Sequence, residues 1–350
     1  MSAIRVGLIG CGVQGEIHLQ ELAGIEGVEL AAIADLDEGR LAKVGDRFGI
    51  PMRCTDAREL LDEGLDLVSI CTMPNTHRDF VVHAVEAGSH VLCEKPLALD
   101  AREGAEMVRA AERAERLLMV GFNMRYLGAT AAIRRFMAEG LLGDLVCARG
   151  YMLASDVPWW GKHYVRALSG GGALNSSAVH MVDLLIWLAG GPKPLTASAS
   201  MATLFPRKRA HNAPAGAAAA YDVEDLLFGH VRFEGGFWFS IEGSWTYDRS
   251  GWNYSFDAHG TRGQAHLDPL ELYTERDGAP VRVFEDAPTQ PDFETAVGPE
   301  LRDVVESVRT GRVAERLATG RQALVVQAVV DALYRSAGEG REVAVEVPDV

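Results

Sequence analysis

Three glycines, Gly10, Gly12 and Gly15, stand in the segment GCGVQG, between the apolar run IRVGLI and a stretch with helical periodicity. In a strand-to-helix turn, the first glycine permits the tight turn, the second lets the backbone approach a pyrophosphate, and the third lets helix and strand pack closely. The N-terminus of the following helix adds a positive dipole. We therefore predict that this loop, with Val13 and Gln14 between its glycines, binds a dinucleotide. The alternative is a glycine-rich turn without a ligand.

Asp35 ends the second apolar run, VELAAIAD, and lies 20 residues after Gly15. A carboxylate at this place can accept hydrogen bonds from the adenosine ribose hydroxyls, and it repels a 2′-phosphate. No arginine follows it at once, since Arg40 is five residues further on. These features favour NAD over NADP as the cofactor. The alternative is that Asp35 caps the next helix, a role that is compatible with cofactor binding but carries no specificity.

Polar side chains follow the third and fourth predicted strands, in the segments CTMPNTHRDF and CEKP. Ligands of open α/β sheets bind beyond the carboxyl ends of the strands, so these side chains should converge on the same crevice as the glycine loop. A lone lysine is more often a surface charge, and its place at a strand end is what makes it a candidate. The residues predicted to line the cofactor site from these segments are Thr72, Pro74, Asn75, His77, Glu94, Lys95 and Pro96.

The elements that would position these residues alternate regularly from residue 4 to about 120, where short, almost wholly apolar runs are separated by amphipathic stretches. This alternation is typical of βαβ units and of a parallel sheet whose two faces are covered by helices. We predict a doubly wound Rossmann domain over residues 1–122.

After Asn123 the pattern becomes that of an α+β domain, predicted over residues 123–350. A helix is expected to open near Gly172 and to end at AGGP, and β-rich runs such as LLFGHVRFEGGFWFSIEGSW alternate with period two. These runs predict an antiparallel sheet of consecutive strands joined by hairpins, one of which turns at residues 234–236. The last 50 residues return to helix and finish on a short strand, EVAVEV.

Six short motifs occur in a fixed order along the chain: GCGVQG, Asp35, TMPNTH, EKP, GFNMRY and GGGALNSSAVHMVDLLIWLAG. Together they resemble the glucose-fructose oxidoreductase, inositol dehydrogenase and related (Gfo/Idh/MocA) family over nearly the whole chain. The resemblance implies a Rossmann domain that binds NAD or NADP, followed by an α/β domain whose large open antiparallel sheet often forms the homodimer or homotetramer contact. It also implies oxidation or reduction of a hydroxyl-bearing carbon on a sugar, inositol or similar polyol.

The resemblance extends to the reacting residues. Lys95 matches the family's catalytic lysine near the nicotinamide, and His180 matches the histidine of its DxxxH motif. This chain departs from the family in having Ser176 where that aspartate would stand. One helical turn from His180, Ser176 is predicted to hydrogen-bond a substrate hydroxyl, but it cannot charge-stabilise an imidazolium. Asp183 is either a partial replacement for the missing carboxylate or a structural contact.

A loop between a strand and the His180 helix offers further substrate contacts. Its aromatic faces and interspersed donors suit a pyranose, although tryptophan-rich loops are also ordinary hydrophobic plugs. The loop residues considered are Trp159, Trp160, Lys162, His163 and Tyr164, and substrate contact is predicted for Trp160, Lys162 and His163.

Two residues of GFNMRY lie at the predicted domain junction, where the resemblance places groups near the nicotinamide or the substrate. We assign Asn123 to the cofactor and Arg125 to the substrate. The alternative for Arg125 is a salt bridge at the junction.

The overall composition excludes several classes of protein. A formal charge of −15 and a pI near 5.1 oppose the binding of nucleic acid. Five scattered cysteines without a CxxC pair argue against a disulfide framework and a structural zinc site, so no metal is expected. The N-terminal residues lack the features of a signal peptide, and no apolar run is long enough to span a membrane. We therefore expect a cytoplasmic protein without a membrane partner.

These observations predict an NAD-dependent dehydrogenase that oxidises a secondary hydroxyl of a sugar, glycoside or cyclic polyol. Lys95 would accept the hydroxyl proton, with His180 and Ser176 beside it in the catalytic set. Two alternatives remain open: an enzyme that cleaves glycosides through transient oxidation by a tightly held NAD, and a non-catalytic sensor of NAD and sugar.

Overall fold

A computed structural model describes residues 3–208, 213–248, 251–283 and 293–350. The chain forms two compact units, here called the first unit (Met1–Asn123, Phe293–Leu324 and Pro348–Val350) and the second unit (Met124–Asp292 and Val325–Val347). The boundary predicted after residue 122 lies close to the first crossing between them. It assigns residues 293–324 to the later domain, however, whereas in the structure they belong to the first unit.

The first unit contains a seven-stranded sheet in the order β15-β6-β5-β4-β1-β2-β3. Strands β1 to β6 run parallel, and β15 pairs antiparallel with β6. This is the strand order of a Rossmann fold, which confirms the prediction from the alternating pattern. The short strand β3 was not expected from the sequence. The strands are β1 (Ile4–Ile9), β2 (Val28–Ala34), β3 (Met52–Cys54), β4 (Leu67–Ile70), β5 (His90–Cys93), β6 (Leu118–Val120) and β15 (Ala318–Thr319).

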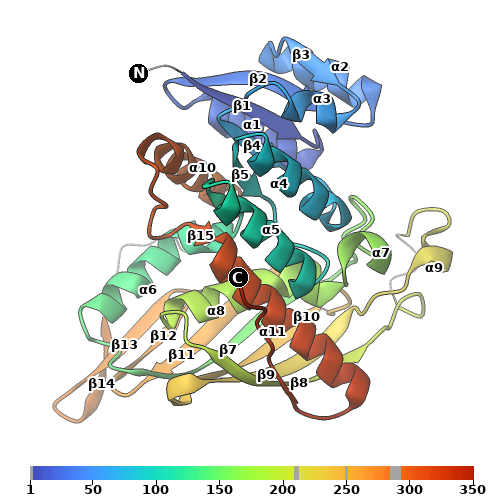
Figure 1. The fold of residues 1–350 in the computed structure, drawn as a ribbon. Helices are drawn as coiled ribbons and strands as arrows, with labels where there is room; N and C mark the ends of the chain where they lie inside the picture. Colours follow the sequence, from blue (N-terminus) through green and yellow to red (C-terminus); the bar gives the residue numbers. More distant parts are fainter. Residues whose placement is uncertain (1–2, 209–212, 249–250, 284–292) are drawn as a thin grey trace. The chain divides into compact units, whose positions relative to one another are not determined.

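Helices connect these strands, and Figure 1 shows α4 and α5 side by side. Aspartates Asp37, Asp56 and Asp100 begin α2, α3 and α5, each accepting a hydrogen bond from a backbone N–H of the first turn. Helix α10 packs against α1, where a Cβ on Gly298 would lie 2.3 Å from the Glu21 carboxylate. The helices are α1 (Val13–Ala23), α2 (Glu38–Phe48), α3 (Ala57–Leu61), α4 (His77–Glu86), α5 (Ala101–Arg113), α10 (Phe293–Thr310) and α11 (Gly320–Glu339), the last of which continues into the second unit.

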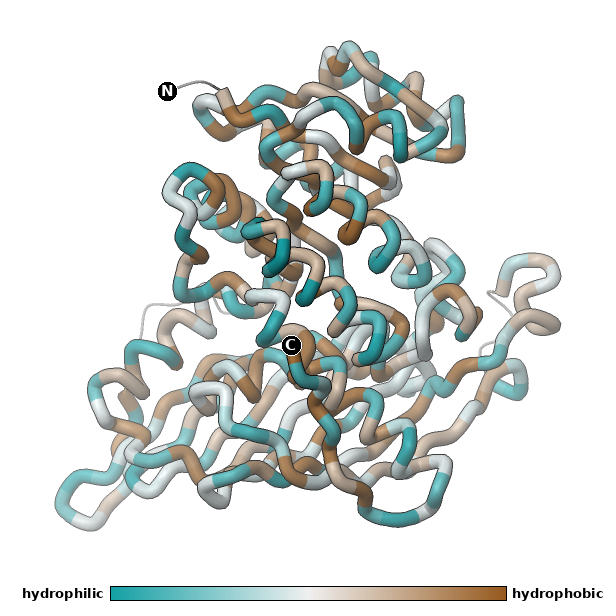
Figure 2. The backbone as a smooth tube through the Cα atoms, in the orientation of Figure 1, coloured by the Kyte–Doolittle hydropathy of each residue, from teal (hydrophilic) through white to brown (hydrophobic). Residues whose placement is uncertain are grey.

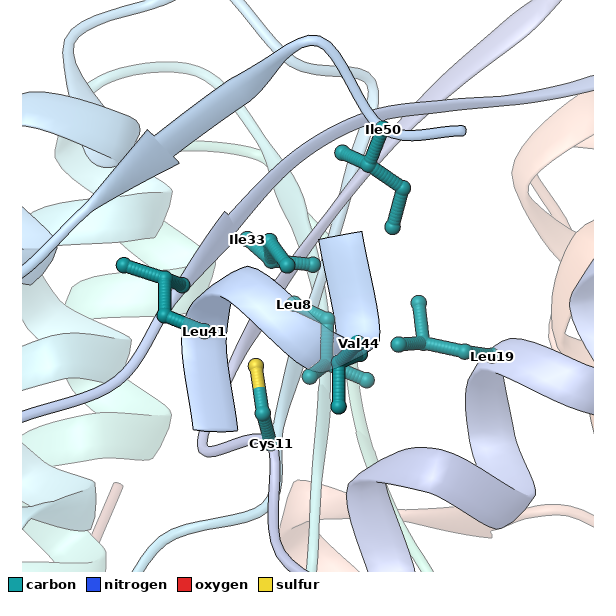
Figure 3. Packing of buried hydrophobic residues seen from close by; sticks show 7 residues of the cluster. All are labelled: Leu8, Cys11, Leu19, Ile33, Leu41, Val44 and Ile50. Atoms are coloured by element: carbon teal, nitrogen blue, oxygen red, sulfur yellow. The ribbon is translucent and has the colours of Figure 1, made fainter. Parts of the chain in front are cut away.

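A hydrophobic cluster joins the glycine loop to β1, β2, α1 and α2 (Figure 3). Cys11, from within the loop itself, is part of this cluster, and its thiol lies 3.8 Å from the Ala34 carbonyl oxygen. Core packing therefore holds the loop against the ends of the first two strands. The buried members are Leu8, Cys11, Leu19, Ile33, Leu41, Val44 and Ile50.

The second unit contains a nine-stranded sheet in the order β14-β13-β12-β11-β7-β10-β9-β8-β16. The predicted hairpin at residues 234–236 is confirmed, because it joins the antiparallel pair β9 and β10. The expectation that all strands are consecutive is wrong at β7, which lies between β10 and β11 and runs parallel to β10. The strands are β7 (Leu145–Ala154), β8 (Pro194–Ala202), β9 (Leu226–Phe233), β10 (Trp238–Ser244), β11 (Trp252–Gly260), β12 (Gly263–His266), β13 (Glu271–Arg276), β14 (Ala279–Val283) and β16 (Val343–Ala344).

Helices α8 and α11 pack on this sheet. A Cβ on Gly150 of β7 would lie 2.5 Å from the Met181 side chain of α8, and Ser336 of α11 accepts a hydrogen bond from the backbone of Ala199 in β8. All ten residues of α8 are buried, whereas hydrophobic and hydrophilic residues are mixed along α11, as expected when one face of that helix is buried (Figure 2). The remaining helices are α6 (Gly128–Ala138), α7 (Arg166–Ser169), a π-helix (Ala173–Ala178) that runs into α8 (Val179–Leu188), and α9 (Ala217–Ala220).

In the part of the chain that the structure describes, no helix is long and apolar enough to cross a membrane. The same residues contain no group of three or more histidines, cysteines, aspartates or glutamates arranged to hold a metal ion.

Candidate active site

The glycine loop has the steric features that its sequence predicts. Gly10 has a φ of +94°, and a Cβ there would lie 2.6 Å from the Cys71 carbonyl oxygen. A Cβ on Gly15 would lie 2.0 Å from the carbonyl oxygen of Gly10, so both positions require close backbone packing. A Cβ on Gly12 would meet nothing within 4 Å, and within the described residues no side chain caps α1 at this point. The loop thus leaves open space at a helix N-terminus, which is what a bound pyrophosphate needs.

Asp35 follows β2 and turns toward the glycine loop. Its carboxylate accepts hydrogen bonds from the backbone N–H of Cys11 at 2.8 Å and of Asp37 at 2.9 Å. The alternative role as a helix cap falls to Asp37, which begins α2 and accepts from the backbone N–H of Arg40. The Arg40 guanidinium also lies 3.2 Å from the Asp35 carboxylate, a contact that the five-residue spacing did not predict.

The loop after β4 carries Thr72, Pro74 and Asn75, of which Asn75 is exposed. The Thr72 hydroxyl lies 2.7 Å from that of Thr76. His77 is 0% exposed, and its ring nitrogens lie 3.2 Å from the carbonyl oxygen of Thr72 and 3.0 Å from that of Pro96. This geometry favours a structural role for His77, whose ring links the loop after β4 to the loop after β5.

Lys95 is half-buried directly after β5. Burial lowers the pKa of its ammonium from the ordinary lysine value, against a smaller opposite effect of the Glu94 carboxylate. Glu94 accepts hydrogen bonds from the backbone N–H of Lys95 at 3.1 Å and from the side-chain amide of Gln14 at 3.0 Å. The first unit thus brings the Lys95 backbone and the glycine loop to one carboxylate. His18 also contacts this carboxylate at 3.2 Å and was not singled out by its sequence context.

Asn123 is buried just after β6, at the end of the first segment of its unit. Arg125 belongs to the second unit and makes a bidentate ion pair with Asp183. Its Nε and Nη2 donate to the two carboxylate oxygens at 2.8 and 2.5 Å. The two side chains are 2% and 0% exposed. The salt-bridge alternative for Arg125 is therefore present in the structure, within the second unit, and Asp183 serves as its partner. We assign this pair a structural role.

Ser176 and His180 lie in one continuous helical segment, and both are buried. The predicted helix is present, but its first turn, which carries Ser176, is a π-helix. The Ser176 hydroxyl lies 3.3 Å from Nδ1 of His163. The loop histidine and the helix serine, both predicted to contact substrate, are thus brought together.

Glu224 anchors the start of this helical segment and was missed by sequence reasoning. Its carboxylate accepts hydrogen bonds from the backbone N–H of Gly172 at 3.0 Å and of Leu174 at 2.9 Å, and from the Tyr334 hydroxyl at 2.8 Å. A Cβ on Gly171 would lie 1.9 Å from the Tyr334 hydroxyl oxygen. The available signal was the run of three glycines: Gly170 ends α7 with a φ of +77°, and Gly171 and Gly172 permit the close approach of this anchor.

The tryptophan-rich loop divides into a packed and an exposed part. Trp159 packs edge-on against Tyr164 at 5.5 Å, and Tyr164 stacks on Tyr221 with ring centroids 6.2 Å apart. Trp160 is 57% exposed, and Lys162 is also exposed. Trp159 and Tyr164 thus form part of an aromatic wall, while Trp160 and Lys162 lie at the surface of the second unit.

The family model described as "Oxidoreductase family, NAD-binding Rossmann fold" (Gfo/Idh/MocA) matches residues 4–122, and the model of the Gfo/Idh/MocA C-terminal domain matches residues 130–266. D-apiose dehydrogenase of Paraburkholderia graminis is 31% identical over 350 residues, which cover 96% of this chain and 88% of that protein. D-glucoside 3-dehydrogenase of Escherichia coli (strain K12) is 28% identical over 360 residues, which cover 98% of this chain and 97% of that protein.

Among solved structures, levoglucosan dehydrogenase in complex with NADH superimposes with a TM-score of 0.88 over 100% of both chains, at 23% identity. This similarity shows that the two proteins share a fold. With both domain models matched and a relative above 30% identity aligned over most of its length, the chain belongs to the Gfo/Idh/MocA family and is an NAD-dependent oxidoreductase.

Proposed function

We propose that the chain oxidises a secondary hydroxyl of a sugar, glycoside or cyclic polyol. The names of its relatives support this substrate class, since they include a D-glucoside 3-dehydrogenase, a D-apiose dehydrogenase and an inositol 2-dehydrogenase. The observation that carries the proposal is the state of Lys95. It lies half-buried at the end of β5 with a lowered pKa, and Glu94 links its backbone to the glycine loop.

The residues of the first unit fit a bound dinucleotide. Gly12 leaves open space at the N-terminus of α1, and Asp35 lies beside the same loop with a carboxylate that can accept ribose hydroxyls. The proposed cofactor contacts also include Val13, Gln14, Thr72, Pro74, Asn75 and Asn123. When bound, NAD⁺ supplies the hydride acceptor.

Lys95 is proposed to accept the hydroxyl proton at Nζ. A lysine acts as a base only in its neutral form, and a lowered pKa increases the neutral fraction near pH 7. His180 hydrogen-bonds the hydroxyl oxygen and orients it, and Ser176 binds a neighbouring hydroxyl. The further substrate contacts that we propose from the loop are Trp160, Lys162 and His163.

A screen for NADH formation tests the proposal. The protein is incubated with NAD⁺ and, in turn, levoglucosan, methyl glucosides, D-apiose and myo-inositol. Absorbance measures the NADH formed, and chromatography measures the change in the sugar. We expect NADH to accumulate with at least one of these compounds. Cleavage of a glucoside without NADH would identify the transient-oxidation alternative, and binding without turnover would identify a sensor. Either result overturns the dehydrogenase proposal.

We further propose that the outer face of the nine-stranded sheet joins copies of the chain into a homodimer or homotetramer. Phe228 and Trp238, from neighbouring strands, are 53% and 38% exposed. Large exposed apolar side chains on one face are typical of interaction surfaces.

All five cysteines are free, which fits a reducing compartment, and we propose that the protein is located in the cytoplasm.

A further inference from the structure

A buried polar cluster lies beneath the Lys95 loop and takes side chains from three elements of the first unit. His18 of α1 is 0% exposed, and its Nε2 lies 3.2 Å from Oε1 of Glu94. Its other nitrogen, Nδ1, lies 2.9 Å from the Ser69 hydroxyl of β4. Both ring nitrogens therefore have oxygen partners, and these partners hold the ring in one orientation.

The second oxygen of the same carboxylate accepts the backbone N–H of Lys95 at 3.1 Å. One carboxylate thus contacts His18 on one side and the Lys95 loop on the other. Glu94 is itself buried, and a buried carboxylate in contact with an imidazole favours the charged form of the ring.

The ionisable groups around His18 are few. Burial lowers the pKa of its ring, but Cys71 and Glu94 together raise it well above the ordinary histidine value. The Cys71 sulfur lies 3.5 Å from Nδ1, and Cys93 is the other thiol near Glu94. A thiol is a weak hydrogen-bonding group and a carboxylate oxygen is a strong acceptor, so we assign Glu94 as the main partner of the ring.

We propose that His18 is a positioning residue for Lys95: through Glu94 it holds the backbone of the Lys95 loop and balances the negative charge beside the Lys95 ammonium. The inference rests on the proposed proton transfer by Lys95. Helix α1 would then have two roles. Its N-terminus faces the space for a pyrophosphate, and its His18 provides a positive charge next to the Glu94 carboxylate.

The proposal predicts opposite effects of two substitutions that break the same pair. His18→Asn removes a positive charge that contacts Glu94, so the pKa of Lys95 should rise. Glu94→Gln removes the negative charge that favours the ammonium, so the pKa of Lys95 should fall. If the pair only supports packing, the pKa of Lys95 should shift in the same direction in both variants, or stay unchanged.

Direct titration by NMR measures these shifts without a substrate. The full chain contains five lysines and ten histidines. Labelling with ¹³C-lysine and ¹⁵N-histidine follows each group, with Lys95→Arg and His18→Asn identifying the two signals. In the unsubstituted protein, the His18 ring should remain protonated at neutral pH. The double variant His18→Asn/Glu94→Gln retains a neutral hydrogen-bonding pair and serves if a single variant does not fold.

Two controls isolate the contact. His83 and Asp62 form an exposed pair of the same unit at the same 3.2 Å, so His83→Asn should leave the Lys95 titration unchanged. Cys71→Ser should leave the His18 ring protonated. A neutral His18 ring at neutral pH, or shifts of the same sign in the two variants, overturns the inference. Failure of the proposed function is a separate result, because it appears as full turnover by Lys95→Ala whatever the NMR titration shows.

Discussion

Lys95 is a poor base in water, because an ordinary lysine keeps its proton at neutral pH. Burial at the end of β5 lowers its pKa, so activity should rise with pH through a value below that of a free lysine. We expect Lys95→Ala to lower kcat by at least ~100-fold, with NAD⁺ affinity within a few-fold of the unsubstituted protein. Initial rates and calorimetry measure the two effects. Lys43→Ala, at an exposed position in α2, is the control and should keep full activity.

The choice between NAD and NADP depends on Asp35 and on the arginine that the fold brings to it. We expect NAD⁺ to bind more tightly than NADP⁺ by roughly 1–3 kcal/mol, because a 2′-phosphate would meet the Asp35 carboxylate. Asp35→Asn should narrow this difference, since it removes the repelling carboxylate and leaves Arg40 paired with the more distant Asp37, at 3.7 Å. Arg40→Ala should widen it. Calorimetric titration with both cofactors tests the set, and equal affinities in the unsubstituted protein would mean that Asp35 does not face the ribose.

Ser176 offers a neutral hydroxyl that lies 3.3 Å from Nδ1 of His163. If it binds substrate, Ser176→Ala removes one neutral hydrogen bond, which contributes about 0.5–1.5 kcal/mol. KM should then rise roughly two- to tenfold with kcat little changed. Steady-state kinetics on the best substrate of the screen decide the matter. A hundredfold loss of kcat at constant KM would place the serine in the proton relay instead.

At the scale of elements, the helix that carries Ser176 and His180 depends on a close approach. A Cβ on Gly172 would lie 1.8 Å from the carbonyl oxygen of Glu224, so Gly172→Ala must displace one backbone from the other. We expect a loss of about 1–3 kcal/mol in the free energy of unfolding, as for overpacked cores, together with a fall in kcat. Thermal unfolding and initial rates measure both. Gly338→Ala in α11, with nothing within 4 Å of the added Cβ, should change neither.

The elements also show where sequence reasoning succeeds and where it stops. Short apolar runs, period-two alternation and the positions of glycines are local signals, and they predicted β1, the glycine loop and the hairpin at residues 234–236. Pairing partners are not local. Nothing in the sequence of β7 itself indicates that it lies parallel to β10, because the two strands are far apart in the chain.

The candidate site follows the same division. Lys95 and the glycine loop could be predicted, because each is recognised from residues that are close together in the sequence. The contacts of Arg40, Glu224 and His18 come from side chains that meet only in the folded unit. The π-turn at Ser176 was likewise not predictable, since helical periodicity alone does not distinguish an inserted residue.

At the scale of the whole molecule, assembly should depend on the outer face of the nine-stranded sheet. Replacing Phe228 with Asp places a charge where a second copy would bury an apolar side chain, which is unfavourable without a partner. We expect Phe228→Asp to shift the chain toward the monomer in light scattering. Arg276→Asp in β13 lowers the net charge by two, against one for Phe228→Asp, at an exposed position of the same sheet, and serves as the control. An unchanged mass in Phe228→Asp would exclude this position from the interface.

The return of α10 and β15 to the first unit has a consequence for how the protein is made. Strand β6 is paired on its outer side by β15, and α1 is covered by α10, yet Met124–Asp292 is synthesised between them. A chain emerging from the ribosome therefore exposes an unpaired strand edge and an uncovered helix throughout translation of most of the second unit. The part of the protein that begins to fold first is completed only when nearly the whole chain has been translated.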